Sequence, residues 1–190
     1  MITASLAPRH PSRTRLLLSV LVLVMSICFS RPLAAQSQQH PLDWKGFGFL
    51  MGEWVGEGGG TPGEAVGGFS FATDLDSTIL VRKNFADYPA TKDRPAFSHH
   101  DLMIVYQEAG EFKADYFDNE HHVIHYTVTP SVDGSTVVFL SEAAPSAPRF
   151  RMTYIQKGTD ALHLTFEIAP PGQPEAFRSY IEATAKRKSP

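Results

Sequence analysis

Short runs of alternating apolar and polar residues follow one another from about residue 47 to the end of the chain. No sustained helical period interrupts them, and Gly, Pro, Asn and Asp separate most runs. Short alternating segments bounded by turn residues are typical of antiparallel strands, and a long meander of such strands closes most simply into a barrel. We therefore predict an all-β, antiparallel up-and-down barrel of about ten strands, at 54–58, 68–73, 79–85, 99–107, 111–117, 121–131, 136–141, 149–156, 161–169 and 177–188.

Turn lengths predict which side chains share a face, because a slip of one residue reverses every side chain of a strand. We assume three-residue loops at 108–110, 118–120 and 158–160, and a two-residue loop at Asp133-Gly134. One face is then polar and charged, with Arg151 opposite Glu167. The opposite face is apolar and rich in tyrosine, and we assign it to the interior: Leu102, Ile104, Tyr106, Phe112, Ala114, Tyr116, His122, Ile124, Tyr126, Val128, Phe139, Phe150, Met152, Tyr154, Leu164, Phe166 and Ile168.

Polar groups on this inward face predict a ligand site. A dry core favours Leu, Ile and Phe, because a buried phenol must find a hydrogen-bond partner. An apolar wall with a few polar groups is the usual lining of a small-molecule pocket. We predict that the ligand-binding residues are Tyr106, Tyr116, His122, Tyr126 and Tyr154. The alternative is that these tyrosines lie near the barrel ends with their hydroxyls in water.

The stretch 47–58 predicts how one barrel end is closed. A short apolar turn leads into Gly52, and Trp54 opens the first strand before Gly56. An indole is large enough to seal a barrel end, and glycine allows a sharp turn and a close approach of the backbone to it. We therefore assign Gly52, Trp54 and Gly56 to barrel closure; a buried tryptophan in a β-sandwich is the alternative.

The motif Gly52-x-Trp54 resembles the first-strand signature of the calycins, the group of lipocalins and fatty-acid-binding proteins. With Gly56 and Gly58 it is more similar to the nitrobindins and to a family of uncharacterised bacterial barrel proteins. Further stretches that resemble the bacterial family are 49–54, 100–106, 116–124, 139–141, 149–154 and 166–172. This resemblance implies a lipocalin-like barrel and no established activity.

Resemblance to the nitrobindins also implies a haem held by an axial histidine near the C-terminal strand. Here the segment 177–186 has no histidine. The inward-facing His122 would have to serve as a substitute axial ligand. A haem protein acting on reactive nitrogen species is therefore an alternative function, and a structural barrel without a ligand is a second one.

The N-terminal 35 residues read as a cleaved signal peptide, with basic Arg9, Arg13 and Arg15, an apolar run at 16–29 and small residues before Gln36. Its 14 apolar residues are short for a membrane span, and a retained N-terminal anchor is the alternative. Residues 36–46 then form a flexible lead-in and 47–188 the single barrel domain. We expect an exported protein, periplasmic or secreted, with no transmembrane segment in the mature chain.

The mature chain offers little for catalysis or for nucleic-acid binding. The signal contains four of the 17 Lys and Arg and none of the 20 Asp and Glu, which leaves 13 against 20 and a net charge of −7. This charge argues against a nucleic-acid partner. Cys28, the single cysteine, lies in the signal, and the chain has no Gly-x-Ser-x-Gly motif. His121 and His125 would stand about 13 Å apart along one strand, too far to share a zinc ion.

We therefore predict no catalytic residues, no metal site and no cofactor apart from the haem alternative. The function that the sequence favours is a carrier or sensor for a small, mainly apolar or amphipathic ligand, with apolar contacts supplying most of the affinity.

Overall fold

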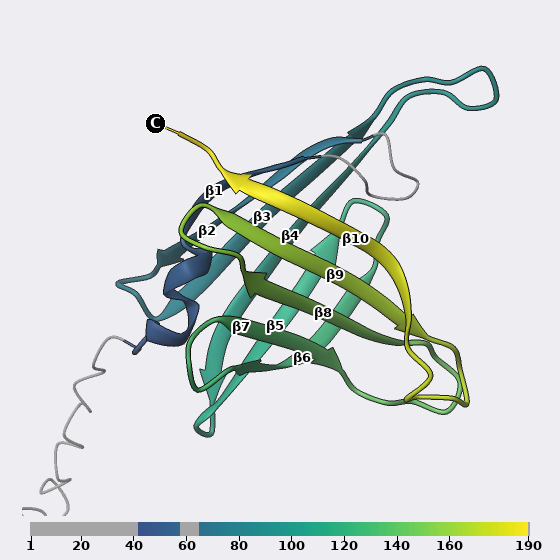
Figure 1. Ribbon diagram of the computed structural model, residues 1–190. Helices are drawn as coiled ribbons and strands as arrows, with labels where there is room; N and C mark the ends of the chain where they lie inside the picture. The colour runs from purple at the N-terminus through teal and green to yellow at the C-terminus, as the bar shows by residue number, and fades with distance from the viewer. Residues whose placement is uncertain (1–41, 58–64, 190) are drawn as a thin grey trace, which may run out of the picture. The chain divides into compact units, whose positions relative to one another are not determined.

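The computed structural model describes residues 42–57 and 65–189. The predicted signal and most of the predicted lead-in lie outside these residues. Ten antiparallel strands close into a barrel in which each strand pairs with its neighbours in sequence and β1 pairs with β10 (Figure 1). The elements are η1 (Lys45–Leu50), β1 (Gly52–Gly56), β2 (Val66–Asp74), β3 (Ile79–Tyr88), β4 (Phe97–Glu108), β5 (Glu111–Asp118), β6 (Val123–Pro130), β7 (Thr136–Ser141), β8 (Arg149–Gln156), β9 (Ala161–Ala169) and β10 (Arg178–Arg187). The predicted all-β barrel is confirmed.

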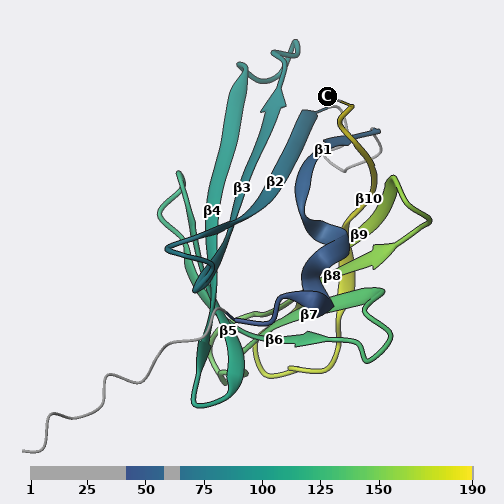
Figure 2. The same ribbon diagram turned by 90° about the vertical axis from the view of Figure 1, so that its left-hand side faces the viewer.

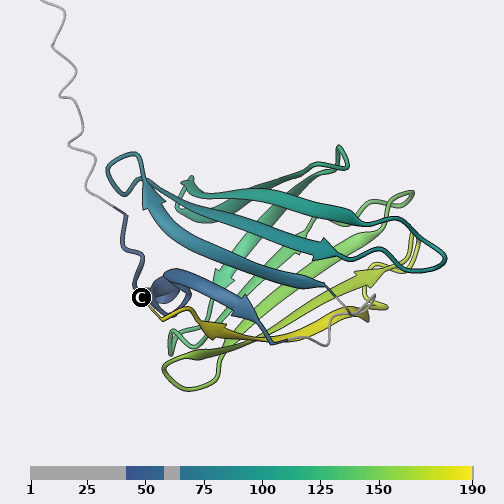
Figure 3. The ribbon, with the colours of Figure 1, turned by 90° about the horizontal axis from the view of Figure 1, so that it is seen from above.

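The two ends of the barrel differ. At the η1 end, short connections join β2 to β3, β4 to β5, β6 to β7 and β8 to β9. At the far end, the connections cover residues 89–96, 119–122, 142–148 and 170–177, and all but 119–122 are longer than those at the η1 end. The hairpin of β3 and β4 projects beyond the other strands at this far end (Figure 1). Seen from above, the early and late strands form two layers that cross each other (Figure 3).

The 3-10 helix η1 fills the first end of the barrel. It lies between the two walls of strands in Figure 2, and Phe47, Phe49 and Leu50 are buried there. The ring of Phe47 packs edge-on against Phe112 of β5, with 5.0 Å between the ring centroids. Apolar helix residues on strand residues thus form a dry seal.

Trp44 extends this seal and corrects the predicted lead-in. Its indole is buried against Phe112, and its Nε1–H donates a hydrogen bond of 2.9 Å to the carbonyl of Ser77. Residues 36–46 were expected to be a flexible lead-in, but Trp44 and Lys45 belong to the closed end. An indole so close to an apolar helix removes a large area from water.

Trp54 is buried at the barrel end that contains η1, in agreement with the prediction that it is buried at one end. Its side chain is 2% exposed, and its Nε1–H donates to the carbonyl of Leu50 at 2.8 Å. The guanidinium of Arg187 covers the indole at 4.2 Å from the ring centroid and also donates to the carbonyl of Met51. Gly52 has a φ of +105°, and a Cβ there would stand 2.9 Å from Arg187, so glycine is required at this position.

Gly56 does not share this requirement. A Cβ at Gly56 would meet its nearest neighbour, the carbonyl oxygen of Gly67, at 3.5 Å, an ordinary contact distance. The predicted closing role is therefore supported by the backbone at Gly52 and not at Gly56.

Two of the predicted hairpin registers are confirmed. Val128 of β6 pairs with Phe139 of β7, although the connection after Pro130 is longer than the two residues assumed. Phe150 of β8 pairs with Ile168 of β9, as the three-residue loop at 158–160 predicted.

The registers of the β4–β5 and β5–β6 hairpins were wrong. Strands β4 and β5 are joined by two residues, Ala109-Gly110, and Met103 faces Tyr116 where Leu102 was expected. This slip of one residue turns Leu102, Ile104 and Tyr106 to the outside.

The β5–β6 connection shifts the register by two residues, which keeps Ile124, Tyr126 and Val128 of β6 on their predicted inward face. Ala114 pairs with Tyr126, where Ile124 was expected, and Tyr116 pairs with Ile124 in place of His122.

Candidate functional site

A buried ion pair lies inside the barrel, between its closed end and its far end. The guanidinium of Arg82 on β3 pairs with the carboxylate of Asp101 on β4, and the two side chains are 5% and 4% exposed. Asn84 Nδ2 donates a hydrogen bond of 2.8 Å to the second carboxylate oxygen. The next inward residues toward η1, Leu80 and Met103, are fully buried and apolar. The charged pair therefore lies next to the fully buried apolar residues that fill the η1 end of the barrel.

His99 continues this network toward the far end. Its Nε2 lies 3.1 Å from the Tyr116 hydroxyl and 3.5 Å from Asp101 Oδ2, while its Nδ1 lies 2.8 Å from Glu120 Oε1. The pKa of His99 is raised to about 9, chiefly by its interaction with Asp101 and further by Glu120, against the lowering effect of burial. His99 is therefore an imidazolium at neutral pH, with both nitrogens engaged by neighbouring side chains.

Tyr116 joins the network to the 119–122 turn. Its hydroxyl donates to Asp118 Oδ2 at 3.2 Å, and the same carboxylate oxygen lies 2.8 Å from His122 Nδ1. Burial and the charges of Asp101 and Asp118 raise the pKa of Tyr116, so the phenol stays protonated. Burial tends to raise the pKa of Asp118, but hydrogen bonds from the backbone and ring of His122 and from the Glu120 backbone bring it below its ordinary value.

Tyr126 and Tyr154 stand around the Arg82 guanidinium. Both side chains are buried, and burial raises the pKa of both phenols, that of Tyr154 to about 12, against the lowering effect of Arg82. The Tyr154 ring packs edge-on against Phe69 and Phe71, with 5.5 Å between centroids in each case.

Two buried polar atoms at this level have no hydrogen-bond partner among the described residues, Arg82 Nε and the Tyr154 hydroxyl. The phenol lies within hydrogen-bonding reach of the guanidinium, and this contact tends to raise the pKa of Arg82 and to lower that of Tyr154, opposite to the effect of burial on each. In the observed geometry, however, neither Arg82 Nε nor the Tyr154 hydroxyl completes a well-formed hydrogen bond. Buried donors normally have partners, so two unpaired ones side by side are informative.

Apolar side chains form the wall between this polar layer and the far end. Inward-facing residues near η1, such as Val137 and Leu162, are fully buried. Inward-facing residues nearer the far end retain access to solvent while packing on the core: Ile124, Phe150, Leu164 and Phe166. Most inward residues near η1 are therefore fully buried, whereas the apolar ones nearer the far end are only partly buried.

Three of the five predicted ligand residues face the interior. Tyr116, Tyr126 and Tyr154 lie there around the Arg82–Asp101 pair, as the face assignment predicted. Tyr106 was wrongly placed, because it pairs with Lys113 on the outer face.

The predicted inward position of His122 was also wrong. It precedes β6 in the turn at 119–122, and its side chain is 61% exposed and bonded to Asp118. Phe117 pairs with Val123, so five residues lie between the last paired residues where three were expected, and His122 stays outside the strand.

Four polar residues of the interior were missed: Arg82, Asn84, His99 and Asp101. For His99 and Asp101 the signal was a second alternation in 99–105, where the even positions look more apolar but the odd ones face inward. Recognising Ala109-Gly110 as a two-residue turn would have selected the odd set.

The histidine positions do not fit the haem alternative. His122, the proposed axial ligand, points to the exposed turn, and the inward-facing His99 has both ring nitrogens bonded. Within 42–57 and 65–189, no three His, Cys, Asp or Glu residues are grouped closely enough to hold a metal ion.

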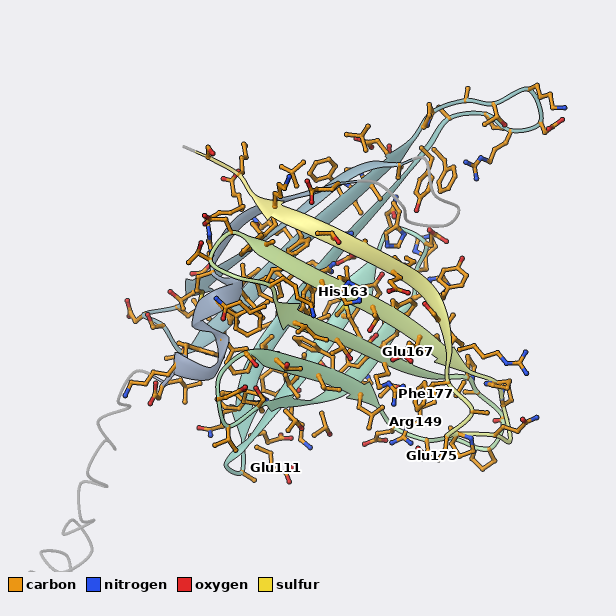
Figure 4. The ribbon with its side chains drawn as sticks, in the orientation of Figure 1. Glu111, Arg149, His163, Glu167, Glu175 and Phe177 are labelled. Atoms are coloured by element: carbon orange, nitrogen blue, oxygen red, sulfur yellow. The ribbon has the colours of Figure 1, made fainter. Side chains whose placement is uncertain are left out.

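On the outer face, the connection 170–177 is bound to β8 (Figure 4). Arg151 forms the predicted pair with Glu167 through two hydrogen bonds of 2.6 and 2.7 Å, and its guanidinium lies 4.2 Å from the centre of the Phe177 ring. Arg149 is paired with Glu175. These contacts hold the connection against the outer face of the barrel and involve side chains outside its interior.

None of the helices that the structure describes is long and apolar enough to cross a membrane. No model of a known protein family matches the chain, and no curated protein sequence matches it significantly.

Proposed function

We propose that the protein is an exported binding barrel, a carrier or sensor, that holds a small and mainly apolar molecule in the half of its interior nearest the far end. The observation that carries the proposal is the gradient along the interior. Most inward side chains at the η1 end are fully buried, a polar layer around Arg82 follows, and the apolar side chains beyond it are only partly buried. A concave apolar surface with a few fixed polar groups at its base is the usual design of a small-molecule site.

The energetics favour an apolar ligand over a polar one. Covering the accessible parts of Phe150, Leu164 and Phe166 would remove apolar area from water at about 25 cal/mol per Å². The polar side chains His99, Asp101 and Tyr116 already bond one another, so most of the layer needs no ligand to be satisfied. The apolar side chains would therefore supply most of the affinity, and the polar side chains around Arg82 would orient the ligand.

Native mass spectrometry of the protein from its own host tests the proposal directly. We expect a co-purifying molecule of a few hundred daltons and a chain that begins at Gln36, as the signal predicts. A chain that retains Met1 would contradict export, whether or not a molecule is bound.

A pair of tryptophan variants on β10 tests where that molecule lies. Ala183 pairs with Leu164 on the inward face, and Thr184 pairs with His163 on the outward face of the same strand. Ala183→Trp should fill the wall and release the co-purifying molecule, whereas Thr184→Trp should retain it. Both variants should show the circular dichroism of a folded barrel; if Ala183→Trp is folded and still loaded, the interior is not the site.

A further inference from the structure

Arg82 Nε and the Tyr154 hydroxyl are two hydrogen-bond donors in one buried place. Arg82 is 4% exposed and Tyr154 is fully buried, and neither atom has a partner among the described residues. Leaving a buried donor unpaired is costly, so two such donors side by side need a partner that accepts from both. An oxygen with two lone pairs would complete both.

The charges around these donors select the kind of oxygen. The positive charge of Arg82 is already matched by Asp101. Toward the far end, His99 contacts Asp101 and Glu120, and Asp118 accepts a hydrogen bond from Tyr116. A ligand carboxylate beside Asp101 would add a second buried negative charge without a free cation to compensate it. A neutral oxygen avoids that penalty.

Among neutral groups, a carbonyl meets the requirement most simply. The guanidinium Nε–H can only donate, and a phenol donates readily. A carbonyl oxygen accepts two hydrogen bonds and carries no proton that would need an acceptor of its own. The aromatic rings of Phe69, Phe71 and Phe139 surround Tyr154 and suit the carbon atoms beside such a group.

We infer that Arg82 Nε and the Tyr154 hydroxyl form a subsite for the carbonyl oxygen of a neutral, mainly apolar ligand such as a ketone or an ester. The inference rests on the proposed function, because the chain of the ligand would lie along the wall toward the far end. The carbonyl end of the ligand would lie deepest in the barrel, beside Arg82 and Tyr154. Nothing in this assignment requires bond breaking.

Three probes of equal length separate the inference from the proposed function. They are 2-nonanone, its isostere 2-methyl-1-nonene, in which a methylene replaces the carbonyl oxygen, and nonanoate. Their affinities for the full mature protein are measured by titration calorimetry. We expect the ketone to bind about tenfold more tightly than the isostere, the difference that one or two net hydrogen bonds supply, and more tightly than nonanoate.

Tyr154→Phe and Tyr116→Phe form the matched pair of variants. Tyr154→Phe removes the unpaired hydroxyl and should weaken ketone binding about threefold to tenfold while leaving the isostere unchanged. Tyr116→Phe removes a hydroxyl that already bonds His99 and Asp118, and it should leave the ratio of ketone to isostere as it is. The infrared band of a carbon-13 carbonyl gives a readout independent of affinity: it should shift to lower frequency on binding, and the shift should be smaller in Tyr154→Phe, where only Arg82 Nε still donates.

Each of the other possible results would contradict one part of the proposal. Equal affinity of ketone and isostere would overturn the carbonyl subsite and leave the apolar site standing. Tighter binding of nonanoate would overturn the choice of a neutral ligand. If none of the three probes binds, the carbonyl subsite fails together with an apolar site for chains of this length.

Discussion

Arg82 and Asp101 form an ion pair on neighbouring strands, with side chains 5% and 4% exposed, at the level where the inward apolar side chains change from fully to partly buried. Burial lowers the pKa of Arg82, but Asp101 and the neighbouring phenols outweigh it, so the guanidinium stays charged. Two charges so deep in a barrel are costly to desolvate, and each depends on the other. The pair therefore fixes the relative position of β3 and β4 and the polar base of the site.

Asp101→Asn should destabilise the protein by roughly 3 to 5 kcal/mol, because Arg82 would be left as an uncompensated buried charge. Replacing both residues by apolar ones, Arg82→Met with Asp101→Leu, should cost less than this single change. Asp115→Asn is the control, since Asp115 pairs with the exposed His125 on the outer face and should cost less than about 1 kcal/mol. Denaturant melts measure all three; equal losses for Asp101→Asn and Asp115→Asn would contradict a buried pair.

Trp54→Ala should cost roughly 3 to 5 kcal/mol, because it opens a cavity beneath η1 and leaves the carbonyl of Leu50 without its indole donor. Val55→Ala, one residue along and 43% exposed, is the control and should cost about 1 kcal/mol or less. Urea unfolding followed by circular dichroism compares them. A loss below about 1 kcal/mol for Trp54→Ala would show that the indole does not hold the closed end.

His99 predicts a dependence of stability on pH. Its pKa is raised to about 9 in the folded protein, above the value of about 6.5 in an unfolded chain. A raised folded-state pKa contributes stability that is complete below pH 6.5 and is lost as the pH rises through 9. The urea concentration at the midpoint of unfolding should therefore decrease as the pH is raised from 6 to 10.

His99→Gln should flatten this fall, because the glutamine cannot take up the proton that Asp101 and Glu120 stabilise. His125→Gln, on the exposed outer face, should retain it. A titration of the histidine ring protons by NMR gives the His99 pKa directly. A value near 6.5 would contradict the network.

The strands could be predicted from the sequence, whereas the hairpin registers depended on the turn lengths that were assumed. Alternation and turn residues gave ten strands and a barrel, because those signals are local. The β8–β9 hairpin was placed correctly down to its pairs, Phe150 with Ile168 and Arg151 with Glu167. There the two faces differ clearly in polarity, so only one register buries the apolar set.

The interior polar layer could not be found in the same way. Positions 99–106 offer two alternating sets, His99-Asp101-Met103-Val105 and His100-Leu102-Ile104-Tyr106, and the second is the more apolar. Burying the first set is favourable only because Arg82 comes from another strand to meet Asp101. A long-range partner decides the face, and no pattern within one strand reveals it.

The Ala109-Gly110 turn that selects this face is itself strained, which leads to the last prediction. Ala109 has a φ of +51° and Gly110 a φ of +86°, the signature of a two-residue hairpin turn that favours Asn-Gly. An alanine pays a steric cost in this region that glycine and asparagine largely avoid. Ala109→Asn and Ala109→Gly should therefore stabilise the protein by up to about 1 kcal/mol each, Asn more than Gly because glycine adds freedom to the unfolded chain. Ala114→Gly, at a fully buried position of β5, should destabilise it in the same thermal melts. Loss of stability in both Ala109 variants would mean that 108–110 is, after all, a three-residue loop, with Leu102 and not Met103 facing the interior.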